Sequence, residues 1–150
     1  MSREDDFKTR MTNDATLMAI LTGGVYTKGE VGREGITRET APSAFDDDGY
    51  LEPCALVVQR GLVPDGEVHD EEEQLASAGQ VVEVYLYEDS GYGNIDSALD
   101  RLFTLFFGYQ FTGTFPVELF NMLDRERDEG SLKGASLARQ DWMVREIQGE

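Results

Sequence analysis

The stretch that decides the fold is QVVEVYLYEDSGYGNIDSALDRLFTLFFGYQF, residues 80–111. Side chains alternate along a strand, so Val82, Val84 and Leu86 share one face of a strand over 80–89. Asn94, after a glycine turn, is a suitable N-cap for a helix. The predicted apolar face of that helix consists of Ile95, Ala98, Leu99, Leu102, Phe103 and Phe106. The stretch therefore predicts a strand, a turn and a helix that covers a sheet.

Outward from this unit, further elements are predicted on both sides. Residues 5–24 read as a helix with a kink near Thr12, and Gly23 and Gly24 end it. Strands are expected over 25–29, 54–61, 116–123 and 139–148. The order predicts a single α+β domain over 1–150, with a mainly antiparallel sheet of about four to five strands and two main helices packed on one face.

Two of the connections between the predicted elements are long loops. Residues 28–50 are polar, rich in glycine and without a clear period, which is typical of a long loop. A second, turn-rich loop is expected over 125–136.

The charge of the chain excludes several function classes. Thirty acidic residues face 13 basic ones, giving a net charge of −17, and no basic cluster appears. Binding of nucleic acid normally requires such a cluster, so it is not expected here.

No apolar run approaches the ~20 residues that cross a bilayer, and the opening MSREDDFKTR lacks the apolar segment of a signal peptide. Cys54 is the single cysteine, which excludes a disulfide within the chain.

Three segments have a partial resemblance to ligand sites. His69 lies in an acidic run, 69–73, but lacks the spacing of zinc ligands. The run FDDDGYLE, 45–52, has consecutive carboxylates where a calcium loop alternates them. The glycine pair at 91 and 93 lacks the third glycine of a phosphate loop, and Asp96 would repel an anion there. We therefore expect no metal, no cofactor and no catalytic residue.

Cys54 and three aromatic residues after the helix are further candidates for a functional role. Cys54 begins an apolar strand, which favours a buried, inert thiol. Phe107, Tyr109 and Phe111 leave the apolar stripe of the helix, so they cover either a sheet edge or the surface of a partner.

The pattern as a whole resembles the tail terminator proteins of tailed phages, which are also called tail completion or minor tail proteins of the head–tail joining apparatus. The resemblance is carried by a helix that ends in LTGGVYTKG, by CALVVQRG, by VVEVYLYEDSGYGNIDSALDRLFTLF and by a late WMVREIQ. In the family, the N-terminal helix runs into a G-x-V-Y motif, which is represented here by Gly24, Val25 and Tyr26. The 28–50 loop and the acidic 69–73 run are longer or more charged than in the family pattern.

This resemblance implies a structural virion protein, made in the host cytoplasm, and not an enzyme. It implies a homo-hexameric ring that caps the tail tube, contacts the major tail tube protein and the head–tail connector or neck proteins, and lets DNA pass through its lumen. The long loops would order on assembly. The candidate subunit or partner contacts are Phe107, Tyr109, Phe111, Arg33, Arg38 and Phe45.

Other function classes stay open at this point. A head–tail connector or stopper protein would have the same sequence features. A small acidic cytosolic inhibitor that mimics DNA would also combine a large negative charge with no active site. An enzyme would need a convergent carboxylate pair, such as Asp46 with Glu52, for which no spacing argues.

Overall fold

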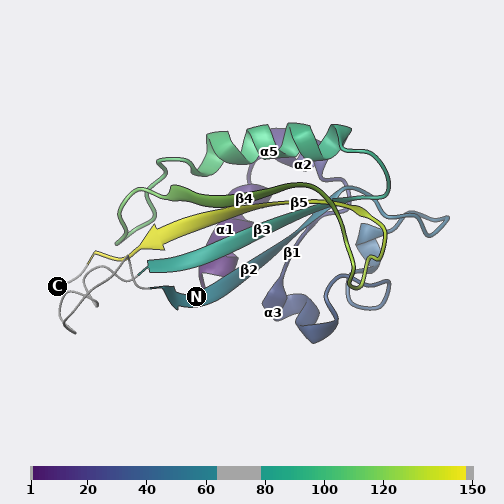
Figure 1. Cartoon of the computed structure of the whole chain (residues 1–150), viewed down its shortest axis with the longest axis horizontal. Coiled ribbons are helices and arrows are strands. Elements are labelled where there is room, and N and C mark those ends of the chain that lie inside the picture. The colour runs from purple at the N-terminus through teal and green to yellow at the C-terminus, as the bar shows by residue number, and fades with distance from the viewer. Residues whose placement is uncertain (1, 64–78, 148–150) are drawn as a thin grey trace.

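Five strands form one sheet in the order β1–β2–β3–β5–β4 (Figure 1). The structure is a computed structural model that describes residues 2–63 and 79–147. The strands are β1 (Val25–Thr27), β2 (Cys54–Val63), β3 (Gly79–Glu88), β4 (Glu118–Arg127) and β5 (Ser136–Arg145). The expected α+β class with a mainly antiparallel sheet is confirmed.

The sheet is mixed because its first strand runs parallel to its neighbour. Val25 of β1 lies opposite Ala55 of β2 in a parallel pair. The other three pairs are antiparallel, and β3 pairs with β5 along its whole length, from Gly79 opposite Arg145 to Glu88 opposite Ser136. The long connection from β1 to β2 makes the parallel pair possible.

Three helices cover one face of this sheet (Figure 1). They are α1 (Arg3–Thr12), α2 (Ala15–Ile20) and α5 (Gly93–Phe106). The predicted kink after Thr12 is present, with Asn13 as the C-cap of α1. The carboxylate of Asp14 accepts the amide hydrogen of Leu17 and so caps α2. None of the described helices is long and apolar enough to cross a membrane.

A first hydrophobic core fills the space between these helices and the sheet. Alternate residues of β2, β3 and β5 point into it, because the side-chain period of a strand is two. The rings of Phe7 on α1 and Phe106 on α5 stack with centroids 4.3 Å apart. The largest fully buried side chains of this core are Trp142, Phe7, Phe106, Met11, Leu17, Leu21, Leu86, Ile95 and Leu102.

The predicted cap of α5 is wrong, and a residue of β3 replaces it. The N-cap of α5 is Tyr92, which makes no side-chain cap bond. The carboxylate of Glu88 instead accepts hydrogen bonds from the backbone amides of Asn94 and Ile95, both at 3.2 Å. It also accepts one from the side-chain amide of Asn94 at 2.6 Å. Sheet and helix thereby meet through a carboxylate at the positive end of the helix.

The buried stripe of α5 differs from the predicted one at a single position, where Leu105 takes the place of Phe103. Phe103 is 42% exposed, whereas Leu105 is buried. The other predicted apolar positions are buried as expected. Near its C-terminus α5 therefore turns Leu105 toward α1 and leaves Phe103 at the surface beside β4.

The segment 28–50, predicted as a plain loop, covers the second face of the sheet. It contains the short helix α3 (Lys28–Val31) and two 3-10 turns, η1 (Gly32–Glu34) and η2 (Pro42–Ala44). Thr27 and Glu30 form a capping box that starts α3. A second core of buried residues lies beneath this segment: Val31, Ile36, Ala41, Ala44, Leu51, Cys54, Leu56, Val58, Tyr87, Leu132, Ala135 and Leu137.

The connection between β4 and β5 is shorter than the predicted 125–136 loop, because β4 continues to Arg127. The carboxylate of Asp128 accepts the amides of Gly130 and Leu132 at 3.1 and 2.8 Å. Leu132 is buried in the second core. The turn is thus tied to its own backbone and to the sheet.

The helix α2 ends at Ile20 with Leu21 as its C-cap, and the two glycines predicted to end it lie in the turn that follows, for different reasons. Gly24 has a φ of +96°, which favours glycine. Gly23 packs against the backbone before β2, where a Cβ would lie 2.9 Å from the carbonyl oxygen of Glu52 and 3.0 Å from that of Pro53. The amide of Gly23 also donates to Pro53 at 2.8 Å.

Candidate interaction surface

The thiol of Cys54 is buried at the start of β2. Burial raises its pKa to about 12, because the charged thiolate loses its solvation. A thiol in this state is a poor nucleophile, as the sequence predicts.

One carboxylate of the acidic 45–52 segment, that of Asp46, is used within the segment itself. Asp46 Oδ1 accepts the backbone amides of Asp48 and Tyr50, both at 2.9 Å. Across residues 2–63 and 79–147, the structure contains no group of three or more acidic, histidine or cysteine side chains placed to hold a metal ion. The predicted weak candidate at His69 and the acidic run 69–73 lies outside the described residues.

The N-terminus of α5, which follows the glycine turn, does not offer its amides to an external anion. Gly91 has a φ of +78°, which sets the turn. The helix amides that an anion would use already bind the Glu88 carboxylate. The chain itself supplies the anion at this place.

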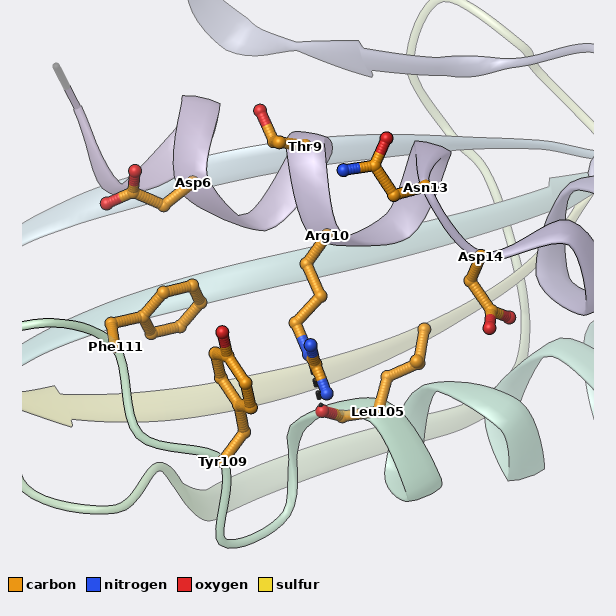
Figure 2. Close-up of a pocket in the computed structure, with 8 residues that line it drawn as sticks. All are labelled: Asp6, Thr9, Arg10, Asn13, Asp14, Leu105, Tyr109 and Phe111. Carbon is orange, nitrogen blue, oxygen red and sulfur yellow. Dashed lines mark hydrogen bonds between the residues drawn. The ribbon is translucent and has the colours of Figure 1, made fainter.

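Tyr109 and Phe111 lie on the segment that follows α5, and their side chains face α1 (Figure 2). Arg10 Nε donates to the carbonyl oxygen of Leu105 at 2.8 Å, and its guanidinium lies 3.5 Å from the centroid of the Tyr109 ring. Phe111 lies 5.4 Å from Phe7, centroid to centroid. Both rings are half-buried, and these contacts join α1 to α5 within one chain.

Phe107, by contrast, is 57% exposed. Its ring stacks on Phe103 at 4.8 Å. Phe103 lines a shallow groove of about 360 Å³ with Leu119 and Met122 of the edge strand β4. We call these four residues, Phe103, Phe107, Leu119 and Met122, the α5–β4 patch.

Acidic side chains rim the α5–β4 patch. Asp96, Asp100 and Asp124 line the same groove. Asp96 pairs with Arg125 at 2.7 Å. Asp100 and Asp124 form no ion pair with any of the described residues.

The edge strand beside the patch is irregular. Its register against β5 shifts between Leu119 and Asn121 and again between Leu123 and Glu126. Arg125 has a φ of +53°, in the left-handed region. The hydroxyl of Tyr92 donates to the carbonyl oxygen of Glu126 at 2.6 Å, so part of the strand edge is already bonded.

Arg38 and Phe45 lie together in a separate groove of about 700 Å³ near the second core. The Arg38 guanidinium lies 5.6 Å from the Phe45 ring centroid and donates to the carbonyl oxygen of Gly49 at 2.8 Å. Exposed Tyr50 and Lys133 line the same groove.

Arg33 lies at a third place, a hollow of about 250 Å³ on the α3 side of the sheet. Lys28 and Arg60 also line this hollow, and Tyr85 stands in its wall. Arg60 is paired with Glu83 at 2.8 Å. Lys28 and Arg33 have no carboxylate partner within the part of the chain that the structure describes.

The six sequence-predicted contact residues thus fall at four places and form no common site. Met122 and Leu119 were not singled out from the sequence, because β4 has no clean alternation of buried and exposed residues. In the sequence these two residues are separated from α5 by more than ten residues. Nothing in their local pattern indicates that the helix lies beside them.

Comparisons with known proteins define the fold alone. No protein-family model matches the chain, and no curated protein sequence matches it. The fold is similar to a chain in a solved structure described as the virion of a native gene transfer agent (GTA) particle. The TM-score is 0.56 at 13% identity, and the match covers 95% of this chain and 92% of that one. The chain therefore shares an almost complete domain architecture with a protein of that particle.

Proposed function

We propose that this chain is a structural protein of a phage-like virion and that it acts as a tail terminator. In this role it forms a homo-hexameric ring that caps the tail tube and joins it to the neck. DNA passes through the lumen without specific binding. The observation that carries the proposal is the end-to-end likeness of fold to a chain of the gene transfer agent virion.

The physical character of the domain supports this role. The strands β2, β3 and β5 are covered on both faces, which gives a rigid body that can hold surfaces at fixed angles. The net charge of −17 suits a protein that stands beside DNA, because like charge keeps the phosphate backbone from adhering. Exposed apolar side chains such as Phe107 and Met122 are of the kind that subunit contacts cover.

The proposed partners are further copies of the chain, the major tail tube protein and the connector or neck proteins. Phe107, Arg33 and the Arg38–Phe45 pair are the candidate contacts that face outward. Tyr109 and Phe111 are proposed as contacts through their exposed edges only. The assembled protein would reside at the junction of tail and neck, after synthesis in the host cytoplasm.

The test is the size of the purified protein, alone and with the tail tube protein. Light scattering and negative-stain images are expected to show six-fold rings, alone or on tube ends. A strict monomer in the presence of tube protein would refute the proposal. Rings that bind neck proteins but not tubes would assign the chain to the connector or stopper class.

The charge also favours one alternative, an acidic inhibitor that mimics DNA. Such a role requires a row of carboxylates spaced like phosphates on one surface. A pull-down from host lysate that returns a nucleic-acid enzyme, together with no self-assembly, would support this alternative.

A further inference from the structure

The groove at the α5–β4 patch combines apolar and acidic side chains. Among the described residues it is lined by four apolar residues, three acids and one amide: Leu99, Phe103, Leu119, Met122, Asp96, Asp100, Asp124 and Gln140. No lysine or arginine is among these lining residues, and only Asp96 has a cationic partner, Arg125. The groove is therefore suited to a cationic group that is carried on an apolar stem.

Gln140 supplies a second and independent sign of a ligand in this groove. It is only 2% exposed, and its Nε2 donates to the carbonyl oxygen of Leu99 at 3.2 Å. This bond fixes the orientation of the amide, because the reverse orientation would set two oxygens against each other. Gln140 Oε1 is buried and accepts no hydrogen bond from the described residues, which is unfavourable for an acceptor. Met122, opposite Gln140 in the β4–β5 pair, is 43% exposed and flexible enough to move aside for a donor.

We propose that this groove binds an arginine side chain on an apolar segment of a different protein. The methylene stem of the arginine contacts Phe103 and Leu119, and its guanidinium meets the carboxylates of Asp100 and Asp124. One of its five N–H donors reaches Gln140 Oε1. The inference deepens the proposed function, on which it rests for the identity of the partner as another protein of the virion.

A second copy of this chain is a less suitable occupant of the groove. Each copy carries a net charge of −17, so acidic surfaces of two copies repel each other. Most arginines of the chain are also held in ion pairs with their own carboxylates, as Arg60 is with Glu83 and Arg101 with Asp14. A basic segment of another protein meets neither obstacle.

Two labelled peptides test the chemistry of the site on the full chain. The probe is a fluorescein-labelled peptide with the sequence Ala-Leu-Arg-Ala-Leu-Arg-Ala, and its control carries citrulline, a neutral isostere, at both arginine positions. Fluorescence anisotropy is expected to give the citrulline peptide a Kd at least about tenfold higher, because it lacks the charge-assisted hydrogen bonds. In amide NMR spectra the arginine peptide is expected to shift the side-chain amide signal of Gln140 and the backbone signals of 99–103 and 119–124.

Two double variants with the same change of charge test the location of the site. Asp100→Asn/Asp124→Asn removes both free carboxylates of the groove and is expected to raise the Kd of the arginine peptide about tenfold. Asp47→Asn/Asp48→Asn, at exposed positions of the 45–52 segment, is the matched control and should change this Kd by less than about twofold. All four substitutions are at exposed positions, and thermal unfolding verifies that both variants are folded.

The outcomes separate this inference from the proposed function. Equal affinities for the two peptides, a groove variant that binds like wild type, or NMR shifts confined to the 45–52 segment would each overturn the inference. Self-association of the wild type that the arginine peptide blocks, and that the groove variant lacks, would assign the groove to a second copy instead. None of these results touches the tail-terminator role, which the separate measurement of rings decides. A wild-type chain that stays monomeric with tube protein, yet binds the peptide at the groove, would refute that role and support the arginine site.

Discussion

Loss of the Glu88 side chain is expected to weaken the union of α5 with the sheet. Its carboxylate accepts two backbone amides and one side-chain amide at the start of the helix. Glu88→Ala removes both acceptor oxygens, and with them all three hydrogen bonds, and leaves the buried amide of Ile95 without this partner. Glu88→Gln keeps one amide oxygen in the same place and removes the negative charge.

The expected magnitudes follow from these contacts. A lost cap costs about 1 kcal/mol, and a lost charge at a helix N-terminus costs about 0.3–1 kcal/mol. A buried amide left unpaired adds about 1 kcal/mol or more. Glu88→Ala should therefore lower the free energy of unfolding by about 2 kcal/mol, and Glu88→Gln by about 1 kcal/mol. In a domain of this size the alanine variant should lose about 4–8 °C in Tm.

Urea unfolding followed by fluorescence of Trp142, the single tryptophan, measures the change, because this ring is fully buried beside Phe106. Asp89→Ala, at the exposed neighbouring acid, is the control and should shift stability little. Asn94→Ala loses one hydrogen bond and should cost less than Glu88→Ala. A Glu88→Ala variant within about 0.5 kcal/mol of wild type, or an Asn94→Ala variant that costs more, would refute the assignment of the cap.

Three further predictions follow from other contacts. The hydrogen bond from Arg101 holds the pKa of Asp14 below the ordinary value of an aspartate, so the stabilisation is present at neutral pH and disappears as the pH falls through the folded pKa. Asp14→Asn should accordingly lower Tm at neutral pH, and the gap should close in acid; an equal gap at all pH values would contradict the pairing. The thiol of Cys54, with a pKa of about 12, should react with thiol reagents at pH 8 far more slowly in the native protein than in urea, and equal rates would show that it is accessible. Gly23→Ala should cost about 1–3 kcal/mol in chemical unfolding, because its Cβ would press on the carbonyl oxygen of Pro53; a neutral substitution would mean that this backbone gives way.

The local elements of the fold were readable from the sequence because their periods are strong. Alternation from Val81 to Tyr87 fixed the central strand and both of its faces. The apolar spacing of 95–106 fixed α5 and its orientation toward the sheet. These signals lie within single elements, where one residue's neighbours in sequence are also its neighbours in space.

The features that sequence reasoning missed depend on contacts between elements. Glu88 displaced Asn94 as the cap because β3 ends where its carboxylate reaches the helix amides. The cover formed by 28–50 has scattered apolar residues, such as Val31, Ile36 and Ala44, whose common face appears only when the chain folds back over β2. Phe103 reached the surface because β4, an edge strand with two register shifts, leaves the end of α5 uncovered.

The same two shifts have a consequence for how the free protein behaves before assembly. An open sheet with a long, regular outer strand invites another chain to extend it, and repeated extension leads to fibres. Here the bulges and the left-handed backbone at Arg125 break the outer ladder into short pieces. We therefore expect the β4 edge of unassembled copies to resist extension by another chain, so that contacts on this side are made through side chains.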